Sequence, residues 1–168
     1  MIHINKLLLV NKIPYEEFNY EQSDCKYGLI NYLKPEDDGY NSGYIYLGSD
    51  TSETIKFADT ADEALSITPK NLILNYPFRK TVIIPLSNCT TVKDLMVDCL
   101  NAYKACYVIE DKTTNIEPTL LGEIGKEPMY NRVETDGIIG IWGHCIDDLV
   151  FHDIYIYEDG NVGMCISS

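Results

Sequence analysis

The sequence predicts an α+β fold in which a largely antiparallel β-sheet is packed by one principal helix, at about residues 91–108. Three observations support this prediction. Apolar residues recur at three- and four-residue spacing along 91–108, the periodicity of one helix face. Several short apolar runs elsewhere are rich in the β-branched and aromatic residues that favour strands. The last two of these runs flank Asp159 and Gly160, a pair that suits the tight type I′ turn of a hairpin.

The expected strands are short apolar runs separated by turn-forming residues. They cover residues 2–10, 27–33, 43–48, 54–58, 71–75, 81–85, 154–157 and 162–166. We expect the runs at 43–48 and 54–58 to pair as a hairpin across a polar loop. The run at 81–85 is continuously apolar, as in a strand that is buried on both faces. In the stretch 137–143, three glycines indicate a strand that packs closely, around Trp142.

The principal helix is expected to begin at Thr91 and Asp94, which have the spacing of a capping box. One side of it is apolar and is formed by Val92, Leu95, Met96, Cys99, Leu100, Tyr103, Cys106 and Tyr107. Burying that side against the sheet would contribute on the order of 10–20 kcal/mol before the opposing entropy is counted. We therefore expect this helix to close the core.

A chain of 168 residues fits one globular domain, so residues 1–168 are expected to form a single unit. No repeat or linker divides it. The stretch 110–136 is polar and contains several prolines and glycines. A connection of that length in a compact domain is commonly functional, which makes it a candidate binding loop.

Acidic residues outnumber basic ones by 26 to 13, which gives a net charge of −13 at pH 7. Such a surface repels phosphate backbones and argues against direct binding to nucleic acids. No run approaches the roughly 20 apolar residues of a membrane helix, and the N-terminal apolar run is too short for a secretory signal. We expect a cytoplasmic protein without membrane contact. The abundance of Asn, Ile, Lys and Tyr is typical of A/T-rich bacterial or viral genomes.

The six cysteines are expected to be free thiols: Cys25, Cys89, Cys99, Cys106, Cys145 and Cys165. None lies in a C-x-x-C pair, which argues against zinc ribbons and thioredoxin-like sites. Cys99 and Cys106 would lie about 10 Å apart along the helix, too far for a disulfide. Free thiols indicate a reducing compartment.

Cys89 is the candidate catalytic nucleophile, because it lies just before the helix start. The positive end of the helix dipole would lower the pKa of its thiol. His152 or His144 would then act as the base, and Asp148 would orient it.

The order of cysteine, helix and strand histidine resembles that of papain-like cell-wall peptidases, as do residues 148–151 followed by 152–160. The resemblance implies a cysteine hydrolase. This chain departs from that family's Asp-Cys-Ser-Gly-like nucleophile motif, because Cys89 stands between Asn88 and Thr90. It also lacks the family's spacer before the histidine.

His144, Asp148 and His152 are spaced by four and could hold a divalent metal from one face of a helix. In a strand, His152 would instead share a buried side with Val150, Ile154 and Ile156, as a hydrogen-bonded core residue. The glycines at 137, 140 and 143 match neither the dinucleotide nor the P-loop pattern, so no cofactor-binding residues are predicted and the cofactor stays unknown.

The lack of a strong catalytic constellation favours a non-catalytic binding or assembly module over an enzyme. The 13 tyrosines support this, because tyrosine is enriched in interfaces. The expected partner is another protein or a second copy of the chain. A cysteine hydrolase using Cys89, or a metal-binding protein using His144, Asp148 and His152, are the alternatives.

Overall fold

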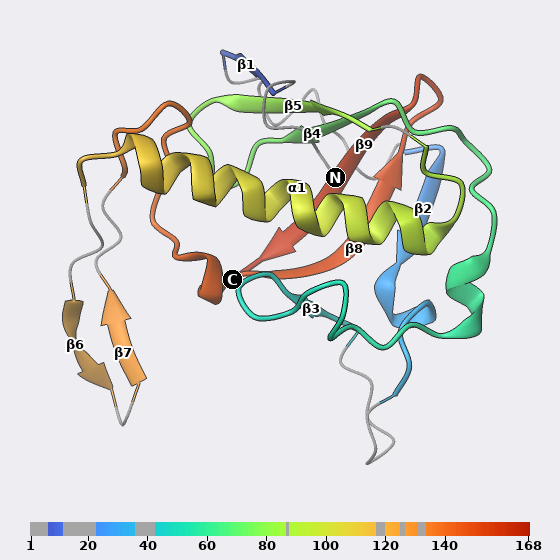
Figure 1. Ribbon diagram of the computed structural model, residues 1–168, viewed down its shortest axis with the longest axis horizontal. Helices are drawn as coiled ribbons and strands as arrows, with labels where there is room; N and C mark the ends of the chain where they lie inside the picture. Colours follow the sequence, from blue (N-terminus) through green and yellow to red (C-terminus); the bar gives the residue numbers. More distant parts are fainter. Residues whose placement is uncertain are drawn as a thin grey trace.

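The computed structural model describes residues 7–11, 23–35, 43–86, 88–116, 120–124, 127–130 and 134–168. Within these ranges one α-helix, α1 (Val92–Thr113), packs along a seven-stranded, mostly antiparallel sheet (Figure 1). This is the predicted α+β architecture. The helix ends at Thr113 instead of near residue 108. Among the described residues, no helix is both long and apolar enough to cross a membrane.

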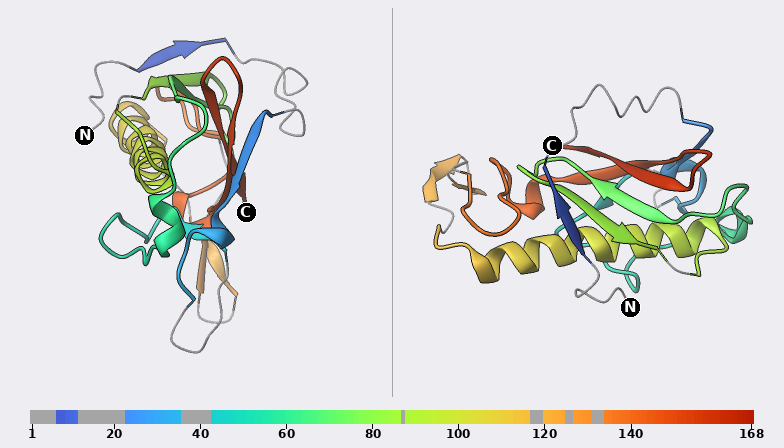
Figure 2. Two further views of the ribbon diagram at one scale, coloured as in Figure 1. Left: turned by 90° about the vertical axis from the view of Figure 1, so that its right-hand side faces the viewer. Right: turned by 90° about the horizontal axis from the view of Figure 1, so that it is seen from above.

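The sheet has the order β1–β5–β4–β9–β8–β2, with β3 also pairing to β8. Its strands are β1 (Leu8–Val10), β2 (Cys25–Gly28), β3 (Ile45–Tyr46), β4 (Asn71–Leu74), β5 (Thr81–Pro85), β8 (Val150–Ile156) and β9 (Asn161–Ser167). Only the contact between β4 and β9 is parallel among these pairs. Figure 2 shows that the sheet curves around α1. The strands β6 (Leu120–Ile124) and β7 (Glu127–Tyr130) form a separate hairpin inside the stretch that was expected to be a loop.

The start of α1 is the capping box that the sequence predicts. The Thr91 hydroxyl accepts from the Asp94 amide, and the Asp94 carboxylate accepts from the Thr91 amide, both at 3.2 Å. All eight residues of the predicted apolar side are buried in the core. Since the cap and the stripe are both local signals, this element follows directly from the sequence.

The expected hairpin between 43–48 and 54–58 is wrong. Ile45 of β3 pairs with Phe151 of β8, and Phe57 forms a single bridge with Leu33. The intervening polar residues fold into a turn of their own, in which Thr54 and Thr51 bond to each other. The short strand β3 instead pairs with the first residues of β8, and β2 pairs with the later ones.

The stretch 137–143 is not a strand either. Gly140 and Gly143 have φ values of +74° and +81°, which an extended strand does not contain. Trp142 is 60% exposed and does not pack into the core. The C-terminal hairpin is confirmed, but its turn is not type I′: only Gly160 of the turn has a positive φ, at +88°.

Candidate functional site

Cys89 lies just before α1, as predicted, but its thiol is buried and donates to the Asp98 carboxylate at 2.9 Å. Burial, and then the hydrogen bond to Asp98, raise the pKa of this thiol. That direction is opposite to the lowering by the helix dipole that was expected. The physical reason is that removal from water and a neighbouring carboxylate both oppose the thiolate.

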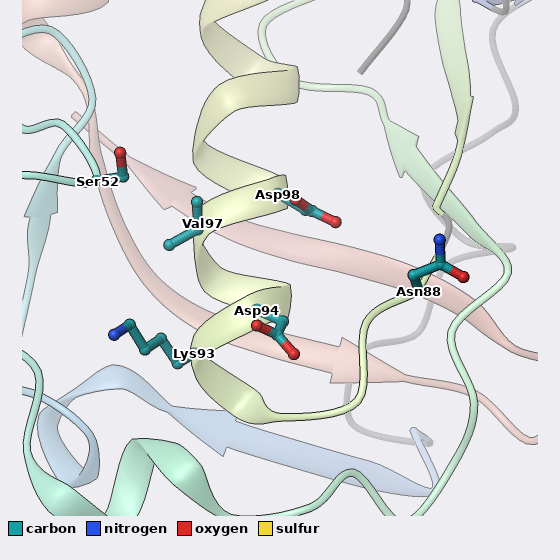
Figure 3. A pocket seen from close by; sticks show the side chains of 6 residues that line it. All are labelled: Ser52, Asn88, Lys93, Asp94, Val97 and Asp98. Carbon is teal, nitrogen blue, oxygen red and sulfur yellow. The ribbon is translucent and has the colours of Figure 1, made fainter. Parts of the chain in front are cut away.

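An open depression of about 390 Å³ lies beside the first turns of α1 (Figure 3). Its lining residues are Ser52, Asn88, Lys93, Asp94, Val97 and Asp98. Cys89 is not among them, although its acceptor Asp98 is. A nucleophilic role for Cys89 stays a prediction from the sequence, without an exposed thiol to support it.

His144 lies in the loop before the 3-10 turn Ile146–Asp148. Asp148 is the last residue of that turn and is exposed. The His144 ring contacts Tyr76, with its Nε2 at 3.0 Å from the Tyr76 hydroxyl. The backbone oxygen of His144 accepts from the Tyr107 hydroxyl at 2.9 Å. These contacts attach His144 to the second half of α1, whereas Cys89 is attached to Asp98, nearer the helix start.

His152 lies on β8, where its Nδ1 is 2.9 Å from an oxygen of Asp153. In the described ranges, one group of three potential metal ligands has ligand atoms within 4.8 Å of one another, and it consists of His152, Asp153 and Cys165. The expected partners do not belong to it: His144 lies before the 3-10 turn Ile146–Asp148, and Asp148 is the last residue of that turn. A role for the predicted trio in metal binding stays a prediction.

The expectation that His152 is a core residue is wrong. The register between β8 and β9 shifts between Phe151 and Asp153, which marks a β-bulge at His152. Because of this extra residue, Phe151 is fully buried with Ile154, and the His152 side chain is 27% exposed beside Asp153. Alternation along the sequence could not reveal the bulge.

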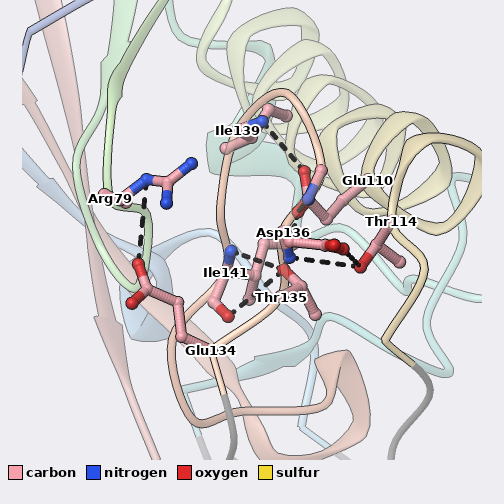
Figure 4. A network of polar contacts seen from close by, with 9 residues as sticks. Arg79, Glu110, Thr114, Glu134, Thr135, Asp136, Ile139 and Ile141 are labelled. Atoms are coloured by element: carbon pink, nitrogen blue, oxygen red, sulfur yellow. Dashed lines mark hydrogen bonds and ion pairs between the residues drawn. The ribbon is translucent and has the colours of Figure 1, made fainter.

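Glu110 is a buried carboxylate near the end of α1, and sequence reasoning did not identify it. It is 1% exposed, and its oxygens accept from the Thr135 hydroxyl at 2.6 Å, the Gly137 amide at 2.8 Å and the Ile139 amide at 2.9 Å (Figure 4). A Cβ atom on Gly137 would lie 2.4 Å from this carboxylate, so only glycine fits there. The contact ties the loop of residues 134–141 to the helix.

Further bonds at the end of α1 hold the same loop. The Asp136 carboxylate accepts from the Thr114 hydroxyl and the Asn115 amide, each at 2.7 Å. The Ile138 amide donates to the Thr113 hydroxyl at 3.1 Å. The loop backbone is therefore fixed to the helix at several points.

This loop leads into Trp142, whose amide donates to the Pro77 oxygen at 2.8 Å. Beside this contact, the Phe78 ring stacks on Tyr103 at 5.4 Å and lies 6.2 Å from Tyr107. The backbone at Trp142 is thus held beside the packed rings of Phe78, Tyr103 and Tyr107, although the indole side chain is exposed.

Asp111, Asp147 and Asp148 are exposed carboxylates. Asp111 is one helical turn beyond Tyr107, whose hydroxyl bonds to His144. Burial raises the pKa of Cys145, and the charges of Asp148, Asp147 and Asp111 raise it further. We call Tyr76, Trp142, Asp111, Asp147 and Asp148 the Trp142 surface.

Comparison of the chain with protein-family models, with curated proteins and with solved structures found no match in any of the three.

Proposed function

We propose that this protein is a binding module whose Trp142 surface docks a basic segment of a partner protein. The observation that carries the proposal is the combination of an indole that is 60% exposed with a loop fixed by the buried Glu110. Tryptophan is among the residues that dominate binding energy at interfaces. A loop that is already ordered loses little entropy on binding, so its rigidity favours recognition.

The exposed carboxylates of the Trp142 surface favour a basic partner; Arg79, whose amide bonds to Gly140, is paired with Glu134 at 3.8 Å. Asp111, Asp147 and Asp148 are exposed, and the whole chain carries a net charge of −13. Opposite charge on the partner would steer its approach and exclude acidic competitors. An arginine or lysine of the partner could also lie over the face of the Trp142 ring, a contact worth about 0.5–2 kcal/mol.

A displayed library of random peptides, selected on the full chain, tests this proposal. We expect selected peptides to be rich in Lys and Arg, and to bind the Trp142→Ala variant at least about tenfold more weakly. The matched control is Tyr46→Ala, because Tyr46 is an aromatic residue with 49% exposure on β3. The control variant should bind these peptides as the unchanged chain does.

The charge contribution has a separate readout. The double variant Asp147→Asn, Asp148→Asn should weaken binding of a selected basic peptide and reduce its dependence on salt. Selected peptides that are not basic, or whose affinity is indifferent to Trp142, would contradict the proposal. Selection of segments of this chain itself would also contradict it, and would indicate self-association.

A further inference from the structure

The bulge in β8 places three side chains with metal-ligating atoms in one cluster. Asp153 pairs with Cys165 across the ladder between β8 and β9. The bulge turns His152 to the side of Asp153, where a regular strand would have placed the two side chains on opposite faces. Sulfur, nitrogen and oxygen ligands thus come together from two adjacent strands that belong to the body of the sheet.

The spacing of the nitrogen and the sulfur suits one tetrahedral metal ion. The His152 Nε2 lies 3.4 Å from the Cys165 Sγ. With bond lengths of about 2.1 Å to nitrogen and 2.3 Å to sulfur, two ligands of one tetrahedral zinc ion lie about 3.6 Å apart. The two atoms therefore need almost no rearrangement to share an ion.

Asp153 supplies the third group. Its carboxylate lies 2.9 Å from the His152 Nδ1, which leaves the Nε2 directed at Cys165. One oxygen of Asp153, one ring nitrogen of His152 and the Cys165 sulfur all lie within 4.8 Å of one another. To become a ligand, the carboxylate would exchange its contact with Nδ1 for the ion. Lys26 lies 3.9 Å from the other carboxylate oxygen, but its side chain is 55% exposed and can turn into solvent.

We propose that Cys165, His152 and Asp153 bind a zinc-like divalent cation, with the fourth coordination position open to water. A thiolate and an imidazole select zinc-like ions over magnesium or calcium, which prefer oxygen ligands. The three side chains are partly exposed, so an ion can reach them from solvent. The cluster shares no residue with the Trp142 surface and does not depend on the function proposed for that surface.

The same three groups could instead form a nucleophile, a base and an orienting carboxylate. Cys165 lies within the paired strand β9 and not at a helix start, so no helix dipole favours its thiolate. This arrangement favours the metal site over a catalytic thiol. The experiment below separates the two.

Titration of the reduced full chain with Co²⁺ tests the site. We expect a thiolate-to-cobalt charge-transfer band that saturates at one equivalent and is abolished by excess Zn²⁺. Cys165→Ser should abolish the band, and His152→Gln and Asp153→Asn should each weaken binding by about 10–100-fold. Cys25→Ser on the neighbouring β2 is the matched control and should leave the titration unchanged, since Cys25 is also a half-buried thiol.

A measurement on the unchanged chain guards against variants that fail to fold. Equimolar Zn²⁺ should protect Cys165 from alkylation, as mapped by mass spectrometry, while Cys25 keeps its rate. Absence of a saturable band, or a band that survives in Cys165→Ser, would overturn the proposal. Rapid alkylation of Cys165 that Zn²⁺ does not slow would also overturn it and would favour the catalytic thiol.

Discussion

At the residue scale, Glu110 links the helix to the loop that carries Trp142. Three donors of that loop, at Thr135, Gly137 and Ile139, converge on its carboxylate. The position is unusual for a glutamate, because it is almost fully buried in α1. The bonds explain how the burial is tolerated, since each carboxylate oxygen accepts at least one donor.

We predict that Glu110→Ala lowers the free energy of unfolding by about 3 kcal/mol or more, because a buried donor left without an acceptor costs about 1–3 kcal/mol. Urea unfolding measures the change. Asp111→Ala is the control: this neighbouring carboxylate is exposed, and its loss should change stability by less than about 0.5 kcal/mol. Equal effects of the two substitutions would show that the loop does not depend on Glu110.

Cys89 gives a second prediction at this scale. Because the pKa of its thiol is raised, less thiolate is present at neutral pH than for an ordinary thiol. Iodoacetamide should therefore modify Cys89 in the folded chain at least about tenfold more slowly than in urea. Peptide mapping after timed quenching gives both rates, with half-buried Cys145 as the internal comparison. A faster rate in the folded chain would contradict this prediction and support the nucleophile hypothesis.

At the element scale, α1 and the C-terminal hairpin could be predicted because their signals are local. The capping pair Thr91 and Asp94 and the apolar stripe lie within the helix itself. β5 is likewise a continuous apolar run, and it forms the strand Thr81–Pro85 as expected. Such elements can be predicted without knowledge of their neighbours, although the extension of α1 from about residue 108 to Thr113 was not predicted.

The elements that were mispredicted depend on contacts far apart in the sequence. β3 pairs with β8, about a hundred residues later, and not with the adjacent run at 54–58. The bulge at His152 exists only in relation to the register of β9. The loop around Trp142 is shaped by Glu110.

The candidate sites likewise depend on contacts between residues far apart in the sequence. His152 was singled out from the sequence, but Asp153 and Cys165 join it only through the pairing of β8 with β9. Trp142 was noted as a packing residue, but it is 60% exposed in a loop that contains the positive-φ glycines Gly140 and Gly143. Residue types can suggest a chemistry, but which residues form one site depends on how strands far apart in the sequence pair.

At the scale of the whole molecule, the core holds several ionisable groups in their neutral form. Burial raises the pKa values of Cys99 and Tyr103 well above the ordinary range, raises that of Cys106 to about 12, and raises that of Tyr107. Burial, followed by the hydrogen bond to Glu63, raises the pKa of Tyr32 to about 12. Each of these groups keeps its proton in the folded chain at a pH where the unfolded chain has lost it.

This difference predicts that the protein loses stability in alkali. Above about pH 9 for thiols and pH 10 for tyrosines, the unfolded chain binds fewer protons than the folded chain, so the free energy of unfolding falls as pH rises. Each group contributes at most about 1.4 kcal/mol per pH unit, and the contribution is fully present below those values. The urea midpoint should therefore fall steadily from about pH 9 to pH 11. Tyr32→Phe removes one titrating group and should make the fall above about pH 10 less steep. A midpoint that holds constant across this range would mean that the thiols and tyrosines of the core reach solvent without unfolding.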